Sequence, residues 1–94
     1  MEGDNKRERT NFGLLMDKWA ADYSHFPMRA DISRWTGASR PYVSSSICST
    51  LDRKVNPYGV VKVEMVDAIA DGMSKEFPHI KFDITEIWRG PSSS

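Results

Sequence analysis

The 94-residue sequence has one cysteine, two histidines and no long apolar run, and each shortage excludes a class of protein. Cys48 stands alone, so the chain forms no internal disulfide and no cysteine-rich zinc site. His25 and His79 have no second histidine or acid at ligand spacing, so we expect no metal site and no cofactor. No stretch approaches the ~20 apolar residues that a membrane helix needs. We therefore expect no membrane contact.

Signals for secretion and catalysis are also missing. The first residues, M-E-G-D-N-K-R-E-R, have no apolar stretch behind their charges, which is not typical of a secretion signal. The chain contains no glycine-flanked nucleophile, no phosphate-binding loop and no cluster of metal ligands. We expect a cytoplasmic protein that is not an enzyme and has no small-molecule substrate.

The formal net charge is zero, but the charges are distributed unevenly along the chain. Between residues 29 and 62 the bases exceed the acids by four, with Arg29, Arg34, Arg40, Arg53, Lys54 and Lys62 against Asp31 and Asp52. Between residues 63 and 86 six acids oppose two lysines. A basic face on a neutral protein can hold a phosphate backbone locally without binding anions everywhere.

The length allows one domain with a single core. Residues 1–9 are polar and aperiodic and residues 90–94 are linker-like, so we expect disordered tails around a domain over residues 10–89. Within that domain, apolar residues at helical spacing after Thr10 or Asn11 predict a first helix that reaches Tyr23; they are Phe12, Leu15, Met16, Trp19 and Tyr23. Pro27 ends the segment that follows this helix, because the residue before a proline is disfavoured in the helical conformation.

Two short helices are predicted on either side of Gly37. The first begins at Met28 or Arg29 and ends at Thr36, where a glycine is suited to the left-handed position past a helix end. The buried residues expected on it are Ala30, Ile32 or Ser33, and Trp35 or Thr36. Ser39 can cap the next helix and Pro41 falls in its first turn, so that helix runs from Arg40 to Thr50 or Leu51.

The rest of the domain is predicted as a loop and two further helices. Residues 52–59 are the loop, and a helix follows whose apolar face comprises Val61, Met65, Val66, Ile69, Ala70 and Met73. Asp83 and Glu86 have capping-box spacing, which predicts a short last helix carrying Ile84, Ile87 and Trp88. The intervening K-E-F-P-H-I-K-F is loop-like, with an extended segment as the alternative. The predicted fold is an all-α, compact five-helix bundle.

The buried and exposed positions counted from Gly37 match those of a helix-turn-helix with this glycine in its turn. Ile32 and Ser33 fall where the two helices touch, and the second helix buries Val43, Ile47 and one of Ser46 or Thr50. Its exposed face is short and polar, with Cys48 on the exposed side and one arginine at the start. Such a face fits a DNA major groove, where a guanidinium makes a bidentate contact with guanine.

We predict that this helix reads double-stranded DNA while neighbouring cations and helix-start amides hold phosphates. The residues expected to contact DNA are Arg29, Arg34, Ser39, Arg40, Pro41, Tyr42, Ser44, Ser45, Arg53 and Lys54. The alternative interpretation is a plain helical hairpin with a solvated serine face.

The segment D-I-S-R-W-T-G-A-S-R-P-Y-V-S-S-S-I resembles the helix-turn-helix of the lambda-repressor-like superfamily of phage Cro and repressor proteins. Its G-x-S-R-P-Y-V-S part is also similar to ParB-type partition proteins. V-E-M-V-D-A-I-A-D-G-M and D-I-T-E-I-W-R resemble the end of small Ner-like phage regulators. The resemblance implies a five-helix DNA-binding domain that represses transcription at a palindromic operator as a homodimer, in the bacterial cytoplasm at the nucleoid.

Two other functions remain open. A plasmid partition or antitoxin-type protein would use the same helix-turn-helix. Six aromatic residues exceed what one small core easily hides, so some are expected to form a dimer face or to bind a partner in a phage-encoded interaction module; they are Trp19, Tyr23, Trp35, Phe77, Phe82 and Trp88.

Overall fold

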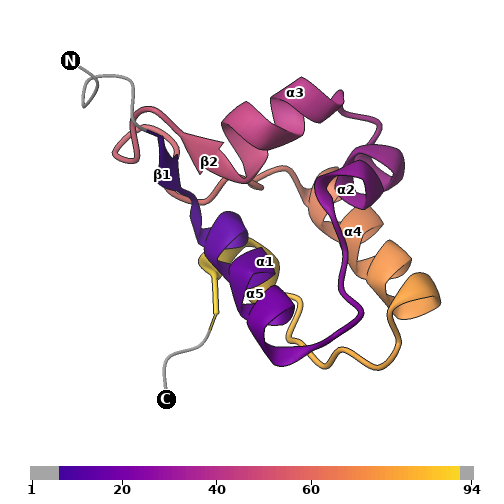
Figure 1. Cartoon of the computed structure of the whole chain (residues 1–94). Helices are drawn as coiled ribbons and strands as arrows, with labels where there is room; N and C mark the ends of the chain where they lie inside the picture. Colours follow the sequence, from indigo (N-terminus) through magenta and orange to yellow (C-terminus); the bar gives the residue numbers. More distant parts are fainter. Residues whose placement is uncertain (1–6, 92–94) are drawn as a thin grey trace.

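The computed structural model describes residues 7–91. Along the chain the elements are β1 (Glu8–Arg9), α1 (Asn11–Asp22), α2 (Arg29–Thr36), α3 (Arg40–Tyr42), η2 (Val43–Ile47), β2 (Ser49–Thr50), α4 (Val63–Glu76) and α5 (Glu86–Arg89). α1 packs against α5 and α2 packs against α4, while α3 lies along the upper edge in Figure 1. Within the described residues the prediction of five α-helices is confirmed, with η2 continuing α3 as a π-type turn.

Thr10 starts α1 as predicted, because its hydroxyl accepts a hydrogen bond from the backbone N–H of Gly13. The same hydroxyl donates to the carbonyl oxygen of Ile47, at the end of η2. The backbone N–H of Thr10 donates to the carbonyl oxygen of Cys48 at 3.2 Å. The start of α1 therefore holds the end of η2.

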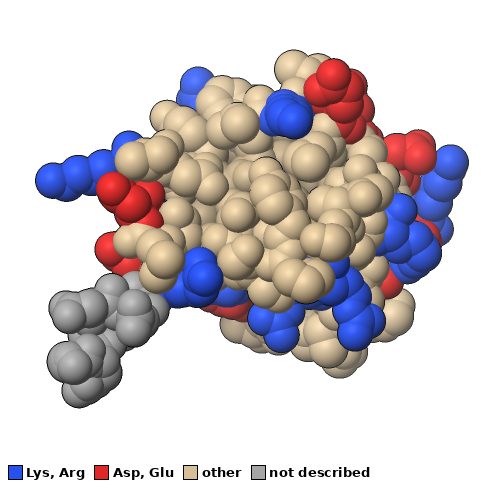
Figure 2. Space-filling model, turned by 90° about the horizontal axis from the view of Figure 1, so that it is seen from above, with Lys and Arg blue, Asp and Glu red and all other residues tan. Residues whose placement is uncertain are grey.

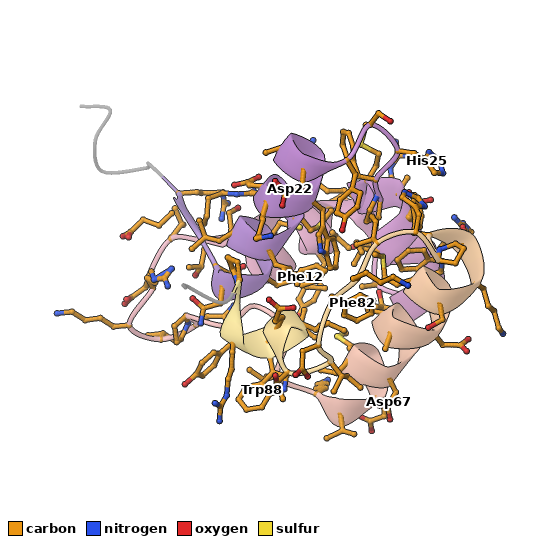
Figure 3. All side chains as sticks on the ribbon, turned by 90° about the horizontal axis from the view of Figure 1, so that it is seen from below. Phe12, Asp22, His25, Asp67, Phe82 and Trp88 are labelled. Carbon is orange, nitrogen blue, oxygen red and sulfur yellow. The ribbon has the colours of Figure 1, made fainter. Side chains whose placement is uncertain are left out.

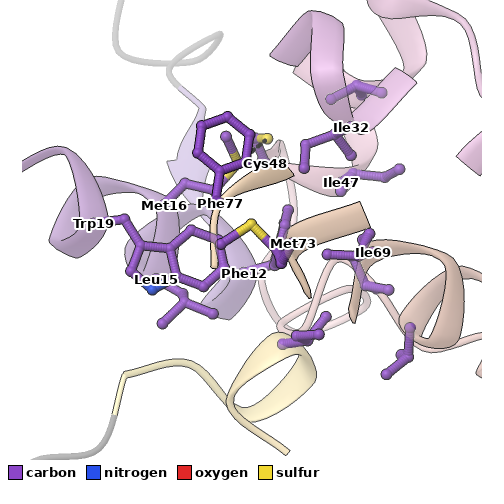
Figure 4. Close-up of a cluster of buried hydrophobic side chains, with 14 of the residues drawn as sticks. Phe12, Leu15, Met16, Trp19, Ile32, Ile47, Cys48, Ile69, Met73 and Phe77 are labelled. Carbon is purple, nitrogen blue, oxygen red and sulfur yellow. Dashed lines mark hydrogen bonds between the residues drawn. The ribbon is translucent and has the colours of Figure 1, made fainter. Parts of the chain in front are cut away.

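The core lies between α1, α2, η2, α4 and α5 (Figure 4). Among residues 7–91 the buried apolar side chains are Phe12, Leu15, Met16, Trp19, Ile32, Val43, Ile47, Cys48, Val60, Val66, Ile69, Met73, Phe77, Ile80 and Ile87. The ring of Trp19 meets Phe12 and Phe82 edge to face, at centroid distances of 6.3 and 5.7 Å. α2 approaches α4 closely because the ring of Trp35 lies over Gly72, which has no side chain.

The chain departs from an all-α fold at a two-stranded antiparallel sheet. Glu8 is paired with Thr50 and Arg9 with Ser49, so the predicted third helix ends at Ile47 instead of Thr50 or Leu51. The helix stops there because side-chain hydroxyls donate hydrogen bonds to its last carbonyl oxygens. The hydroxyl of Ser49 donates to the carbonyl oxygen of Ser44, and that of Thr10 donates to the carbonyl oxygen of Ile47.

The predicted tails overlap the folded part at both ends. Glu8 and Arg9, assigned to the N-terminal tail, lie in β1, and Gly90, assigned to the C-terminal tail, is buried and caps α5. The rest of those tails, residues 1–6 and 92–94, lies outside the described residues.

Three details of the later helices also differ from prediction. α4 begins at Val63, after exposed Val61, because Lys62 is its N-cap. Ile84 is exposed, since it precedes α5, while Ile87 is buried as predicted. Between Asp83 and Glu86 one half of the capping box forms: the Glu86 carboxylate accepts the backbone N–H of Asp83 at 2.8 Å. The segment before α5 is loop, without strand pairing in the described residues.

Candidate nucleic-acid interface

The connection between α2 and α3 is a three-residue turn, residues 37–39, built as the sequence predicts. Gly37 ends α2 with φ of 80°, and its N–H donates to the carbonyl oxygen of Ser33 at 2.8 Å. The hydroxyl of Ser39 accepts the N–H of Tyr42 at 3.3 Å, and Pro41 lies in the first turn. The hydroxyl of Ser33 crosses the turn and donates to Ala38.

After its first turn the second helix widens into the π-type turn η2. The N–H of Cys48 donates to the carbonyl oxygen of Val43, five residues earlier, at 2.8 Å. Val43 and Ile47 are both fully buried, as predicted. Ser44, Ser45 and Ser46 are half-buried. Turns of this type are rare and are often found at functional sites. The sequence predicted a regular α-helix here, because the spacing of its serines does not indicate a π-type turn.

The starts of α2 and α3 face one another across a hollow of about 600 Å³. Arg29 lies on its α2 side, and Arg40, Pro41 and Ser44 lie on the other. Both arginines are exposed, and neither forms a hydrogen bond or ion pair through its side chain with another residue in the range 7–91. At the start of α2 the backbone N–H groups of Arg29 and Ala30 precede the first helical hydrogen bonds, and that of Asp31 already donates to the carbonyl oxygen of Met28 at 3.0 Å. The hollow therefore offers two unpaired guanidinium groups and a helix start, an arrangement that can bind an anion.

One negative group lies near this hollow. The carboxylate of Asp31 accepts the backbone N–H of Met28 at 2.9 Å and so caps α2. Its second oxygen pairs with Arg34 at 2.6 Å, which offsets its charge. Ala30, predicted to be buried, is instead exposed and lines the hollow, because α2 turns Ile32 and half-buried Trp35 toward the core.

Figure 2 looks down on the molecule from the α3 side. The middle of this face is uncharged, Lys and Arg side chains lie around it, and Asp and Glu side chains lie toward its margins. The centre of this face is therefore uncharged, and its margin carries cations with some acids among them. Such a face can approach a phosphate backbone.

Two of the arginines predicted to contact DNA are engaged within the protein. The guanidinium of Arg34 makes two hydrogen bonds to the Glu76 carboxylate, at 2.6 and 2.9 Å. The indole N–H of Trp35 donates to the same carboxylate at 2.9 Å. The hydrogen bonds from Arg34 and then Trp35 lower the pKa of Glu76 to about 2, and the same pairing raises the pKa of Arg34. Arg34 thus ties α2 to the end of α4.

Arg53 is also used internally. Its guanidinium donates to the carbonyl oxygen of Arg9 at 2.7 Å and to the side-chain oxygen of Asn11 at 2.6 Å. It is half-buried and fastens the loop after β2 to the start of α1. Sequence spacing could not reveal these partners, because they lie 42 and 44 residues away.

The remaining predicted contacts differ in what their side chains do. Tyr42 and Lys54 are exposed, whereas the hydroxyl of Ser45 donates to the carbonyl oxygen of Pro41 at 2.8 Å. Arg7, which is not among the predicted contacts, lies beside this helix, because its guanidinium donates to the carbonyl oxygen of Ser45 at 3.2 Å. Only the strand pairing of β1 with β2 brings Arg7 to η2, so no local sequence signal could have identified it.

One further expectation is corrected. Cys48 is buried instead of exposed, because η2 turns it toward Met16, and burial raises the pKa of its thiol to about 11. Of the six aromatic residues expected to exceed the core, Trp19 and Phe77 are buried in it, and the other four are half-buried and pack against it. Their part in a dimer face or partner site stays a prediction. The large apolar side chains that are exposed are mostly aliphatic, and none of these six aromatic residues is among them.

The two histidines, treated separately in the sequence, stack at a ring distance of 5.5 Å, and the Nε2 atom of His79 lies 2.7 Å from the carbonyl oxygen of His25. Among residues 7–91 no three metal-ligating side chains gather into a possible metal site. No helix there has the length and apolarity to cross a membrane. No protein-family model, curated protein or solved structure matches the chain.

Proposed function

We propose that this protein is a sequence-specific double-stranded DNA-binding transcriptional regulator of the phage or mobile-element repressor type. In this proposal α2, the turn at Gly37 and α3 with η2 act as a helix-turn-helix. The observation that carries it is the pair of exposed, unpaired arginines, Arg29 and Arg40, on either side of the hollow between two short helices. The resemblance of residues 31–47 to phage repressors supports the same interpretation.

The start of α3 is the part we assign to base reading. Arg40 can place a planar guanidinium on the O6 and N7 atoms of guanine, and Pro41 and Ser44 add no bulk that would strike the groove walls. Arg29 and the first N–H groups of α2 would hold a phosphate beside it. Tyr42 and Lys54 would contact the backbone around this centre, so removing one of them should weaken binding to all sequences alike.

The structure changes the predicted contact set at two positions. Arg34 and Arg53 have protein partners, so we assign them to holding α2 and α1 in place. Replacing Arg34 should therefore reduce the free energy of unfolding as well as DNA affinity, whereas replacing Arg40 should affect DNA affinity alone. Measuring both quantities for each variant separates the two roles.

The test begins with selection of bound duplexes from a random DNA pool. Anisotropy titration of the selected duplex and a scrambled duplex at two salt concentrations then measures specificity and the number of phosphate contacts. We expect an enriched palindrome with half-sites one helical turn apart and binding that weakens steeply with salt. Absence of enrichment, with equal and weak binding to both duplexes, would show that the protein is not a sequence reader.

Single variants assign the roles. Arg40→Ala should cost about 1 to 3 kcal/mol on the selected duplex and relax the preference at one base pair. Arg29→Ala should weaken both duplexes equally and lower the salt slope by about one. Lys81→Ala is the matched control, since it removes one positive charge from the loop between α4 and α5, at the opposite edge from α3 in Figure 1. Equal losses from Arg40→Ala on both duplexes would refute its role in base reading.

A further inference from the structure

An apolar groove of about 520 Å³ lies between the start of α4, the loop before it and α5. Three aliphatic side chains in it are unusually open to solvent: Val61 is 63% exposed, Val63 70% and Ile84 45%. Tyr58 and half-buried Trp88 stack edge to face in its lining at 6.1 Å. Exposed apolar side chains gathered around one groove can serve as a binding surface.

The groove lies on a side of the molecule different from the α3 face. Seen from below, Trp88 and Asp67 lie near one margin of the molecule (Figure 3), whereas α3 lies along the upper edge in Figure 1. A partner seated in the groove would therefore leave the α3 face open. If that partner were a second copy related by a two-fold axis, both α3 faces could point to the same side.

Charges at the groove favour a second copy as the occupant. Asp67 lines the groove, and the guanidinium of Arg89 lies over the ring of Trp88, 4.8 Å from its centroid. Within residues 7–91 Asp67 pairs with no cation and Arg89 pairs with no carboxylate. A two-fold axis placed so that Arg89 of one copy meets Asp67 of the other repeats that contact, because each copy supplies both signs.

We propose that two copies of this chain dock through this groove as an isologous dimer. Val61 and Val63 of each copy fill the groove of the other, and Arg89 of each approaches Asp67 of the other. Such a dimer would suit the reading of two half-sites one turn of DNA apart. The orientation of the α3 faces rests on the proposed function, whereas the self-association itself does not.

The test is sedimentation equilibrium of the full chain without DNA, over about a hundredfold range of concentration. Wild type should associate to a dimer, and Val63→Glu should raise the dimer dissociation constant at least about tenfold. Val55→Glu is the matched control, because Val55 is 80% exposed but lies outside the groove. Circular dichroism checks that both variants fold. Wild type that stays monomeric, or Val63→Glu that associates like wild type, overturns the proposal.

Charge reversal tests the two-fold arrangement. Asp67→Arg and Arg89→Asp should each weaken association, and the double variant should recover most of the loss because both pairs re-form with reversed sign. A double variant that associates no more tightly than the single variant with the lower affinity overturns the arrangement.

Binding to a DNA half-site separates this proposal from the proposed function. Val63→Glu should bind one half-site like wild type and lose only its advantage on the palindrome. A monomeric wild type that still reads DNA refutes the groove dimer alone. A groove-dependent dimer without sequence preference refutes the DNA-binding function alone.

Discussion

Replacing Gly13 by alanine tests how the end of η2 is held. Gly13 is buried in the first turn of α1, and an added Cβ would lie 2.0 Å from the carbonyl oxygen of Cys48. Close contacts between carbon and a carbonyl oxygen are ordinarily about 3.3 to 3.6 Å. The oxygen would have to retreat by more than an ångström, and it would then lose the hydrogen bond that it accepts from the backbone N–H of Thr10.

Two opposing effects set the magnitude. Alanine is the better helix former by about 1 kcal/mol, which favours the variant. Overpacking costs about 1 to 3 kcal/mol, and leaving the buried N–H of Thr10 unpaired costs about 1 to 3 kcal/mol more. The net expectation for Gly13→Ala is a loss of about 1 to 5 kcal/mol in the free energy of unfolding. The neighbour is backbone, so little relaxation is available.

Urea denaturation followed by tryptophan fluorescence and circular dichroism measures this loss. Ala20→Gly, at an exposed position of the same helix, is the control that calibrates helix propensity and should cost about 1 kcal/mol. Gly13→Ala as stable as wild type, or more stable, would show that the close approach to Cys48 does not limit stability.

Three further results are expected. At Gly37, alanine should cost about 1 to 2 kcal/mol in unfolding free energy because φ is positive, and asparagine should cost less; equal losses would refute the conformational argument. The depressed pKa of Glu76 means that its pairing with Arg34 stabilises the fold above the ordinary carboxylate pKa of about 4.3 and loses that effect as the pH falls toward about 2. Acid titration should therefore unfold Glu76→Gln with a weaker pH dependence than wild type over that window. Cys48 should react slowly with a thiol reagent at pH 8 and quickly after unfolding, since burial raises its pKa; rapid reaction of the folded protein would contradict its placement.

Local signals predicted most of the helices and the turn between α2 and α3. Thr10, Gly37 and Ser39 act at the helix ends where the sequence places them, because capping depends on side chains within a few residues. Helical spacing likewise identified Phe12 and Ile69 as core residues. These parts of the fold are determined by neighbours in sequence.

Features that depend on distant neighbours could not be predicted. The pairing of β1 with β2 joins residues about 40 positions apart, so neither two-residue strand has a local pattern. The partners of Arg34 and Arg53 are equally remote, and they turn expected DNA contacts into structural ties. In the candidate site, the sequence predicted Arg29 and Arg40 correctly as exposed cations, and gave no sign of the hydrogen bond from Arg7 to Ser45.

The bond from the Thr10 hydroxyl to the Ile47 carbonyl oxygen also bears on the order of folding, because it closes a chain segment of 37 residues. Closing such a segment costs about 3 kcal/mol of chain entropy, so this contact forms only when the core supplies compensating burial. During synthesis Thr10 is made before η2, so its hydroxyl has no partner until Ile47 follows. A fragment that begins after α1 would therefore keep the turn at Gly37 but lack Thr10, and the end of η2 would lose this hydrogen bond.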